Sequence, residues 1–173
     1  MTIHDTHPFA DPNPDPVRRF RARVGGVVSL WTAGQAPARA GLTVSSFVVA
    51  AGEPARVLGL VDPDSDLRDQ VEGTGRAVVA LLRWPDRDLA EVFAGLAPAP
   101  GGMFAQATFV ATPWGPRLER ATTWAGVVLE SVVDVGWSAL LTCSVEHVEV
   151  GDEEDPLVHR RGRYQRPPTV GDR

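Results

Sequence analysis

Residues 41–47 read Gly41-Leu42-Thr43-Val44-Ser45-Ser46-Phe47, and this stretch decides our interpretation of the fold. Polarity alternates from Gly41 to Ala51, which predicts one β-strand in which Thr43 and Ser45 share a face. Three hydroxyls in four positions are more than a strand built for burial needs. Together with peptide N–H groups of the following turn, they suit a phosphate or the polar edge of a ring ligand. The alternative is a strand whose Ser and Thr side chains face water.

Short apolar runs on either side of this stretch predict further strands. We expect strands at residues 27–33, 56–61 and 77–82, the last two buried on both faces because their apolar residues run without a break. Residues 127–135 and 139–145 alternate around Gly136, which predicts a hairpin. Helical spacing is found at Leu67 and Val71, and more clearly from Leu89 to Leu96.

Many strands with only two helices predict a mainly β protein, an antiparallel β-barrel with a few short helices. The chain has 173 residues, of which 43% are hydrophobic, so we expect one core and one domain, at residues 17–165. Four prolines predict an extended or disordered arm at residues 1–16, which either stays loose or packs on a partner. Residues 166–173 are predicted to be a loose tail.

Composition excludes several classes of function. A net charge of -5 offers no basic surface for nucleic acid. All 17 basic residues are Arg, so no lysine is present for a Schiff base or a P-loop. One cysteine and no paired His or Cys spacing predict neither a disulfide nor a metal site. The sequence shows no secretory signal and no membrane-spanning run, so we expect a soluble, cytoplasmic protein.

The 43–47 stretch, followed by Glu53-Pro54 and an apolar strand, resembles the first signature of the flavin-reductase-like, FMN-binding split-barrel family. Other segments resemble this family in the same order: Leu89-Ala90 with Phe93-Ala94, Gly115-Pro116 to Leu118, Ala121 to Trp124, Pro156-Leu157-Val158 and Gly162-Arg163-Tyr164. The likeness spans about Arg18 to Tyr164. It implies a Greek-key-like split barrel that works as a homodimer.

The resemblance also implies an activity and a binding site. The activity is that of an NAD(P)H-dependent flavin reductase, such as the small partner of a two-component monooxygenase, with FMN or FAD as the flavin. The implied flavin contacts are Thr43, Val44, Ser45, Ser46 and Phe47, and the segment around Ser65 would meet the phosphate. A helix N-terminus is a natural phosphate site.

The residues around the implied phosphate site conflict with this expectation. Asp62, Asp64 and Asp66 would cap the helix themselves, with Asp64 as the expected N-cap, and would repel a phosphate. Two further positions lack the polar residues that family members carry, since Leu67 stands for a threonine and Ala80 for an asparagine.

The late hairpin departs from the family too, because Gly136-Trp137-Ser138 replaces a Gly-Asp-His motif whose histidine is linked to the nicotinamide. Trp137 could stack on a flavin or nicotinamide ring, and the alternative is core or dimer packing.

Other candidate residues lie elsewhere in the chain. Guanidinium groups suit phosphates, and the candidates are Arg83, Arg117, Arg120 and Arg163, with surface charge as the alternative. His147 and His159 lack a catalytic partner at a recognisable spacing, and Cys143 is expected to be a buried filler.

Three hypotheses remain open from the sequence. The first is a flavin reductase, in which the cofactors carry the chemistry and the protein supplies the pocket and the orientation. The second is a protein that binds flavin, deazaflavin or haem on the same barrel without turnover, which Ser138 favours. The third is a scaffold dimer without a ligand, which the residues at 64, 66, 67 and 80 favour.

Overall fold

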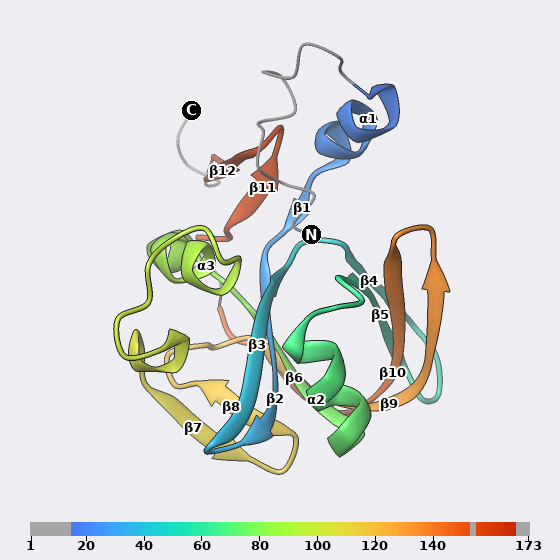
Figure 1. Cartoon of the computed structure of the whole chain (residues 1–173), viewed down its shortest axis with the longest axis vertical. Coiled ribbons are helices and arrows are strands. Elements are labelled where there is room, and N and C mark those ends of the chain that lie inside the picture. The colour runs from blue at the N-terminus through green and yellow to red at the C-terminus, as the bar shows by residue number, and fades with distance from the viewer. Residues whose placement is uncertain (1–14, 153–154, 169–173) are drawn as a thin grey trace.

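The computed structural model describes residues 15–152 and 155–168, and its centre is a curled antiparallel sheet of seven strands (Figure 1). The strands lie in the order β3-β2-β6-β9-β10-β5-β4. Their bounds are Ser29–Gln35 (β2), Ala38–Val44 (β3), Phe47–Ala50 (β4), Arg56–Val61 (β5), Arg76–Leu81 (β6), Trp124–Val135 (β9) and Ser138–Glu149 (β10). Each neighbouring pair is antiparallel, which confirms the predicted barrel.

One continuous segment, residues 38–50, forms both edges of this sheet and so closes it into a barrel. β3 pairs with β2 at one edge and β4 pairs with β5 at the other. The chain changes partner at Ser45 and Ser46, where the peptide N–H of Leu60 donates to the Ser46 carbonyl at 2.8 Å. The prediction of one uninterrupted strand from Gly41 to Ala51 is therefore wrong, because barrel closure bends the strand at this corner.

The described residues form three α-helices, α1 (Pro16–Val24), α2 (Asp66–Thr74) and α3 (Arg87–Phe93), with short 3-10 helices η1 (Trp84–Asp86) and η2 (Met103–Ala105). Helices α2 and α3 pack against the barrel, while α1 lies beside β11 (Val158–Arg160). The helix predicted at Leu67 and Val71 is confirmed as α2, and both side chains are buried. The helix predicted from Leu89 is confirmed as α3, but it ends at Phe93, and Leu96 is exposed.

Two small sheets complete the fold. β1 (Gly26–Val27), β11 (Val158–Arg160) and β12 (Arg163–Gln165) form one, and β7 (Phe109–Thr112) with β8 (Gly115–Leu118) forms the other. The strand predicted at 27–33 is divided at Val28 into β1 and β2. Asp15 caps α1 and Pro16 begins it, while the rest of the predicted arm and residues 169–173 lie outside the described residues.

The core has two parts on opposite faces of the sheet. Trp31 fills the barrel interior, and α2 covers it with Leu67 and Val71. A second cluster packs α3, through Phe93, and the segment of residues 97–121 against the outside of β2 and β6. Residues 77–80 are buried on both faces as predicted, whereas buried and partly exposed residues alternate along β5, because one face of β5 lies outside the barrel.

Candidate functional site

Three of the predicted site segments meet at one end of the barrel. The corner at residues 44–47 is bonded to Leu60, and the loop of residues 62–65 follows directly from β5. Val61, the last residue of β5, pairs with Ala139, so the β9–β10 turn at Gly136 and Trp137 lies beside it. Figure 1 shows the turn and the corner at the same end of the molecule. We call this region the corner end.

The hydroxyls of the corner are largely committed to the protein itself. The Thr43 hydroxyl donates to the carbonyl of Ala90 in α3 at 2.7 Å. The Ser46 hydroxyl donates to the carbonyl of Leu60 at 2.8 Å, so it continues the ladder where the chain changes partner. Ser45 is half-buried, and no side-chain hydrogen bond of Ser45 is found within the described ranges. Ser45 is therefore the hydroxyl at this corner that can donate to a ligand.

The two apolar members of the stretch serve the core. Val44 is 2% exposed inside the barrel, and Phe47 packs partly against the same cluster. The Val44 carbonyl accepts the Ser29 hydroxyl at 2.7 Å, and that hydroxyl also accepts the indole N–H of Trp31 at 3.0 Å. Val44 can therefore position the corner, but its side chain offers nothing to a ligand.

The start of α2 is capped by its own residues. Ser65, and not Asp64 as expected, is the N-cap, because its hydroxyl accepts the peptide N–H of Arg68 at 3.3 Å. The same hydroxyl donates to the Asp62 carbonyl at 2.7 Å. The Asp62 carboxylate accepts the peptide N–H of Asp64 at 2.9 Å. The predicted capping of the helix by carboxylates is therefore wrong, because the Asp62 carboxylate bonds a peptide group of the preceding loop and not of α2.

Trp137 projects from the two-residue turn of the hairpin and is 82% exposed. Packing in the core, one of the two alternatives to ring stacking, is therefore wrong for this side chain. The preceding Gly136 has φ of 58°, a left-handed conformation that glycine adopts without strain. An indole held on such a turn can meet a planar ligand or a second protein surface.

Of the other candidate cations, Arg120 and Arg117 are engaged elsewhere in the protein, and Arg163 is exposed on β12. Arg120 pairs with the buried Asp86 at 2.5 Å, and Asp86 also accepts the peptide N–H of Arg83. Arg117 donates to three backbone carbonyls of residues 118–121. His159 is half-buried against Tyr164, and burial and then Arg21 lower its pKa. Arg117 and Arg120 are not brought to the corner end, whereas His159 pairs with Gly26, which lies against the Ser45 carbonyl.

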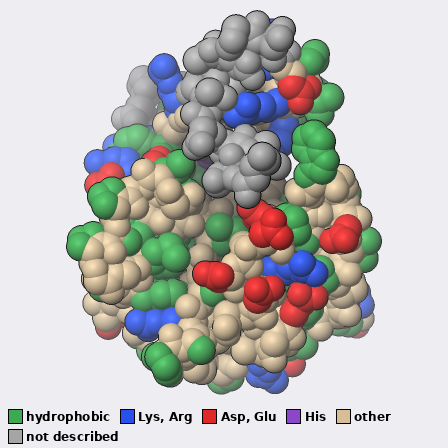
Figure 2. Space-filling model, in the orientation of Figure 1, with side chains coloured by type: hydrophobic (Ala, Val, Ile, Leu, Met, Phe, Trp, Pro, Cys, Tyr) green, Lys and Arg blue, Asp and Glu red, His purple; other side chains and the backbone are tan. Residues whose placement is uncertain are grey.

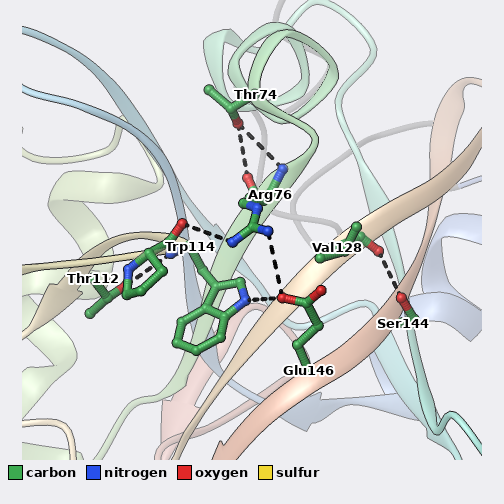
Figure 3. Close-up of polar contacts among 8 residues, drawn as sticks. Thr74, Arg76, Thr112, Trp114, Val128, Ser144 and Glu146 are labelled. Atoms are coloured by element: carbon green, nitrogen blue, oxygen red, sulfur yellow. Dashed lines mark hydrogen bonds and ion pairs between the residues drawn. The ribbon is translucent and has the colours of Figure 1, made fainter.

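A polar and aromatic cluster that the sequence did not predict lies where β9 begins and β10 ends. Glu146 accepts the indole N–H of Trp114 at 2.8 Å and lies 3.8 Å from Arg76 (Figure 3). The Trp114 ring stacks on His147 with centroids 5.1 Å apart. Trp124 donates to Glu149, and this bond, with His147, lowers the pKa of Glu149. The cluster ties β8 to the barrel and shares no residue with the corner end.

The corner end fits a flavin ring better than it fits a flavin phosphate. Ser45 and the peptide groups of the corner can meet the polar edge of a neutral ring, and Trp137 offers a planar face. The phosphate lacks a comparable seat, because the Ser65 hydroxyl is already used as donor and acceptor. Leu67 and Ala80, at two positions where polar contacts were expected, are buried in the apolar core.

Within residues 15–152 and 155–168, no group of three or more His, Cys, Asp or Glu side chains could hold a metal ion. None of the helices in the same ranges has the length and apolar character to span a bilayer.

Comparisons with known proteins identify the family of this chain. Residues 21–168 match the family model described as "Flavin reductase like domain". The chain is 26% identical over 147 residues to "FMN reductase (NADH) RutF" of Stutzerimonas stutzeri, covering 85% of this chain and 84% of that protein.

Two solved structures have a similar fold. The NADH:FAD oxidoreductase SgcE6 of Streptomyces globisporus, in complex with NAD and FAD fragments, superposes with a TM-score of 0.80 at 18% identity, covering 90% of this chain and 93% of that one. The styrene monooxygenase flavin reductase of Pseudomonas putida S12 gives 0.77 at 21% identity, covering 89% and 98%.

Proposed function

Because the chain belongs to the flavin reductase like domain family, we propose that it is a flavin reductase that passes a hydride from NAD(P)H to FMN or FAD. One observation carries the proposal: segments 43–47, 62–65 and 136–137, far apart in the sequence, converge at the corner end. The relative named an FMN reductase (NADH) supports the same activity.

When bound, a flavin supplies the ring that accepts a hydride from a reduced nicotinamide. The residues of this chain bind and orient that ring, and no nucleophile or general acid is needed from them. Ser45 donates to the polar edge of the ring. Thr43 and Ser46 have already used their protons and can only accept, which suits ring N–H groups. Trp137 covers a face of one of the two planar molecules and excludes water.

We propose that the corner end is completed by a second copy of this chain. Of the thirteen exposed large hydrophobic side chains among the described residues, nine lie on elements that adjoin the corner end, namely α1, β1, β4 and the β9–β10 hairpin: Val17, Phe20, Val24, Val27, Val48, Val49, Val133, Val135 and Trp137. Figure 1 shows α1 and the β9–β10 turn projecting there together. Large exposed apolar patches mark interfaces in soluble proteins, and a homodimer would cover them.

The dimer has a direct test by light scattering after size-exclusion chromatography. Phe20→Asp and Trp137→Asp should each shift the protein toward monomer, because a charge would be buried at the interface. Val150→Asp is the matched control, since Val150 is 79% exposed but lies beyond the far end of β10. A wild-type monomer, or an equal effect of all three substitutions, would argue against this interface.

The flavin reductase activity has its own test. The purified protein should bind flavin, seen as quenching of flavin fluorescence, and should oxidise NADH or NADPH when flavin is added. Ser45→Ala should weaken flavin binding by roughly two- to thirteenfold, the range expected for one lost hydrogen bond. Ser131→Ala, at an exposed position of β9, should change nothing. If the protein neither binds flavin nor oxidises either nicotinamide, the proposal is wrong.

A flavin-binding protein without turnover is the second candidate, and one observation favours it. Ser138 occupies the hairpin position where the resemblance led us to expect a histidine, while His147 lies toward the opposite end of the same strand, β10, and His159 lies on β11. Tight flavin binding without oxidation of NADH or NADPH would identify this function. The styrene monooxygenase flavin reductase among the similar structures supports a monooxygenase as the partner if turnover is found.

A further inference from the structure

The start of α2 is the part of the corner end where the family resemblance places a flavin phosphate. The Ser65 hydroxyl and several peptide N–H groups there already make hydrogen bonds within the protein. The Ser65 hydroxyl accepts from Arg68 and donates to the Asp62 carbonyl. The peptide N–H of Asp64 is taken by the Asp62 carboxylate, and that of Asp69 by the Ser65 carbonyl. The peptide N–H groups of Asp66 and Leu67 make no hydrogen bond within the described ranges, so an anion arriving here would find two peptide donors but no free hydroxyl.

The charge of this segment opposes an anion as well. Five acidic residues, all exposed, lie between residues 62 and 72: Asp62, Asp64, Asp66, Asp69 and Glu72. The basic residue in the same span is Arg68, whose guanidinium pairs with Glu72 at 3.1 Å and donates to the Pro63 carbonyl at 3.0 Å. Figure 2 shows acidic side chains gathered on this face of the molecule. The segment has a net charge of -4 before a ligand arrives.

These two observations outweigh the attraction of the helix dipole. A helix N-terminus carries about half a positive elementary charge, whereas the segment has four uncompensated carboxylates. A flavin phosphate is itself nearly a dianion near neutral pH. Charges within about one Debye length, roughly 8–10 Å in physiological salt, are only partly screened from one another. The carboxylates of this segment therefore oppose a phosphate at the start of α2, whereas the four arginines of α1 act in the opposite sense.

We propose that this chain recognises flavins through the ring and excludes the phosphate, so that its substrates are isoalloxazines irrespective of the tail, with riboflavin bound at least as tightly as FMN. This inference rests on the proposed flavin function and specifies its substrate class. The carboxylates at the start of α2 set the specificity by raising the dissociation constant of FMN. A flavin held by its ring alone exchanges readily, as befits a diffusible substrate.

Binding titrations with riboflavin and FMN at low and high salt test the inference. Riboflavin should bind as tightly as FMN or more tightly at low salt. FMN binding should strengthen as salt screens the repulsion, while riboflavin binding should stay constant. FMN binding ten or more times tighter than riboflavin binding, and weakened by salt, would overturn the inference and leave the flavin function intact. If neither flavin binds, the proposed function itself fails.

Charge-neutral variants locate the effect. Asp64→Asn combined with Asp66→Asn should tighten FMN binding by roughly three- to tenfold without changing riboflavin binding. Asp88→Asn combined with Asp152→Asn removes the same charge from exposed positions outside this segment, and should alter the ratio of the two dissociation constants by less than twofold. Thermal melting of both double variants shows whether they fold. Equal effects of the two double variants on FMN binding would refute a local role for the α2 carboxylates.

Discussion

Gly59→Ala should destabilise the barrel, because Gly59 lies directly against the ring that fills it. A Cβ atom at this position would lie 2.7 Å from Cη2 and 2.8 Å from Cζ2 of Trp31. Ordinary carbon contacts are about 3.5–4.0 Å, so the overlap is about 1 Å. Trp31 is 0% exposed and bonded to Ser29, and Gly59 is paired with both Phe47 and Leu141, so neither side can retreat easily.

Overpacking of this kind costs about 1–3 kcal/mol. A domain of this size loses about 2–4 °C in Tm for each kcal/mol, so the Tm should fall by roughly 2–12 °C. Urea unfolding and thermal melting both measure the loss. Gly73→Ala is the matched control, because a Cβ there meets nothing within 4 Å. It should instead stabilise α2 by about 0.5–1 kcal/mol.

A double-mutant cycle identifies the contact. Trp31→Phe removes the two ring atoms that the new methyl group would strike, so Gly59→Ala should cost much less in the Trp31→Phe background. Equal costs in the two backgrounds, or a Gly59→Ala protein as stable as the wild type, would refute the reasoning.

Three further predictions concern buried polar groups. Burial, and then Glu130, raise the pKa of the Cys143 thiol to about 12, so this thiol should not react with Ellman's reagent at pH 8 until the protein is unfolded. Burial also raises the pKa of Tyr164, the single tyrosine, to about 12 from its usual 10.0. Tyrosinate absorbance should therefore appear near pH 12, and the stability that the neutral phenol contributes below pH 10 should be lost as the pH rises toward 12. Arg120→Ala should cost about 1–3 kcal/mol in urea unfolding, since it strips the partner from the 3%-exposed Asp86 carboxylate, and Asp86→Asn in the Arg120→Ala background should recover part of the loss.

Local patterns in the sequence were sufficient for most of the barrel. Alternation predicted the β9–β10 hairpin, and β5 was predicted at its observed bounds. Helix α1 was missed although Val17, Phe20 and Val24 have helical spacing, because it directly follows a proline-rich stretch that was assigned to an extended arm. All three are exposed, so α1 contributes no buried apolar face by which it could be recognised.

The candidate site was only partly readable from the sequence. The resemblance to a known family identified the 43–47 stretch and Ser65 as candidate site residues. Trp137 was a candidate because it lies in a predicted hairpin turn. What each hydroxyl can do depends on partners distant in the chain, since Thr43 donates to Ala90 and Ser46 donates to Leu60. No local pattern encodes such bonds.

The sequence by itself determined the strand pattern, the charge and the family likeness, because these depend on residue type and spacing along the chain. Only the tertiary structure decided which groups remain available to a ligand. Closing the barrel bends residues 38–50 at Ser45 and consumes the hydroxyls on either side of it. In the β5–α2 loop, the Ser65 hydroxyl likewise donates to the Asp62 carbonyl, and the peptide N–H of Asp64 donates to the Asp62 carboxylate. Each polar group inside a protein bonds to a partner that the tertiary fold places beside it, and these partners are often distant in the sequence.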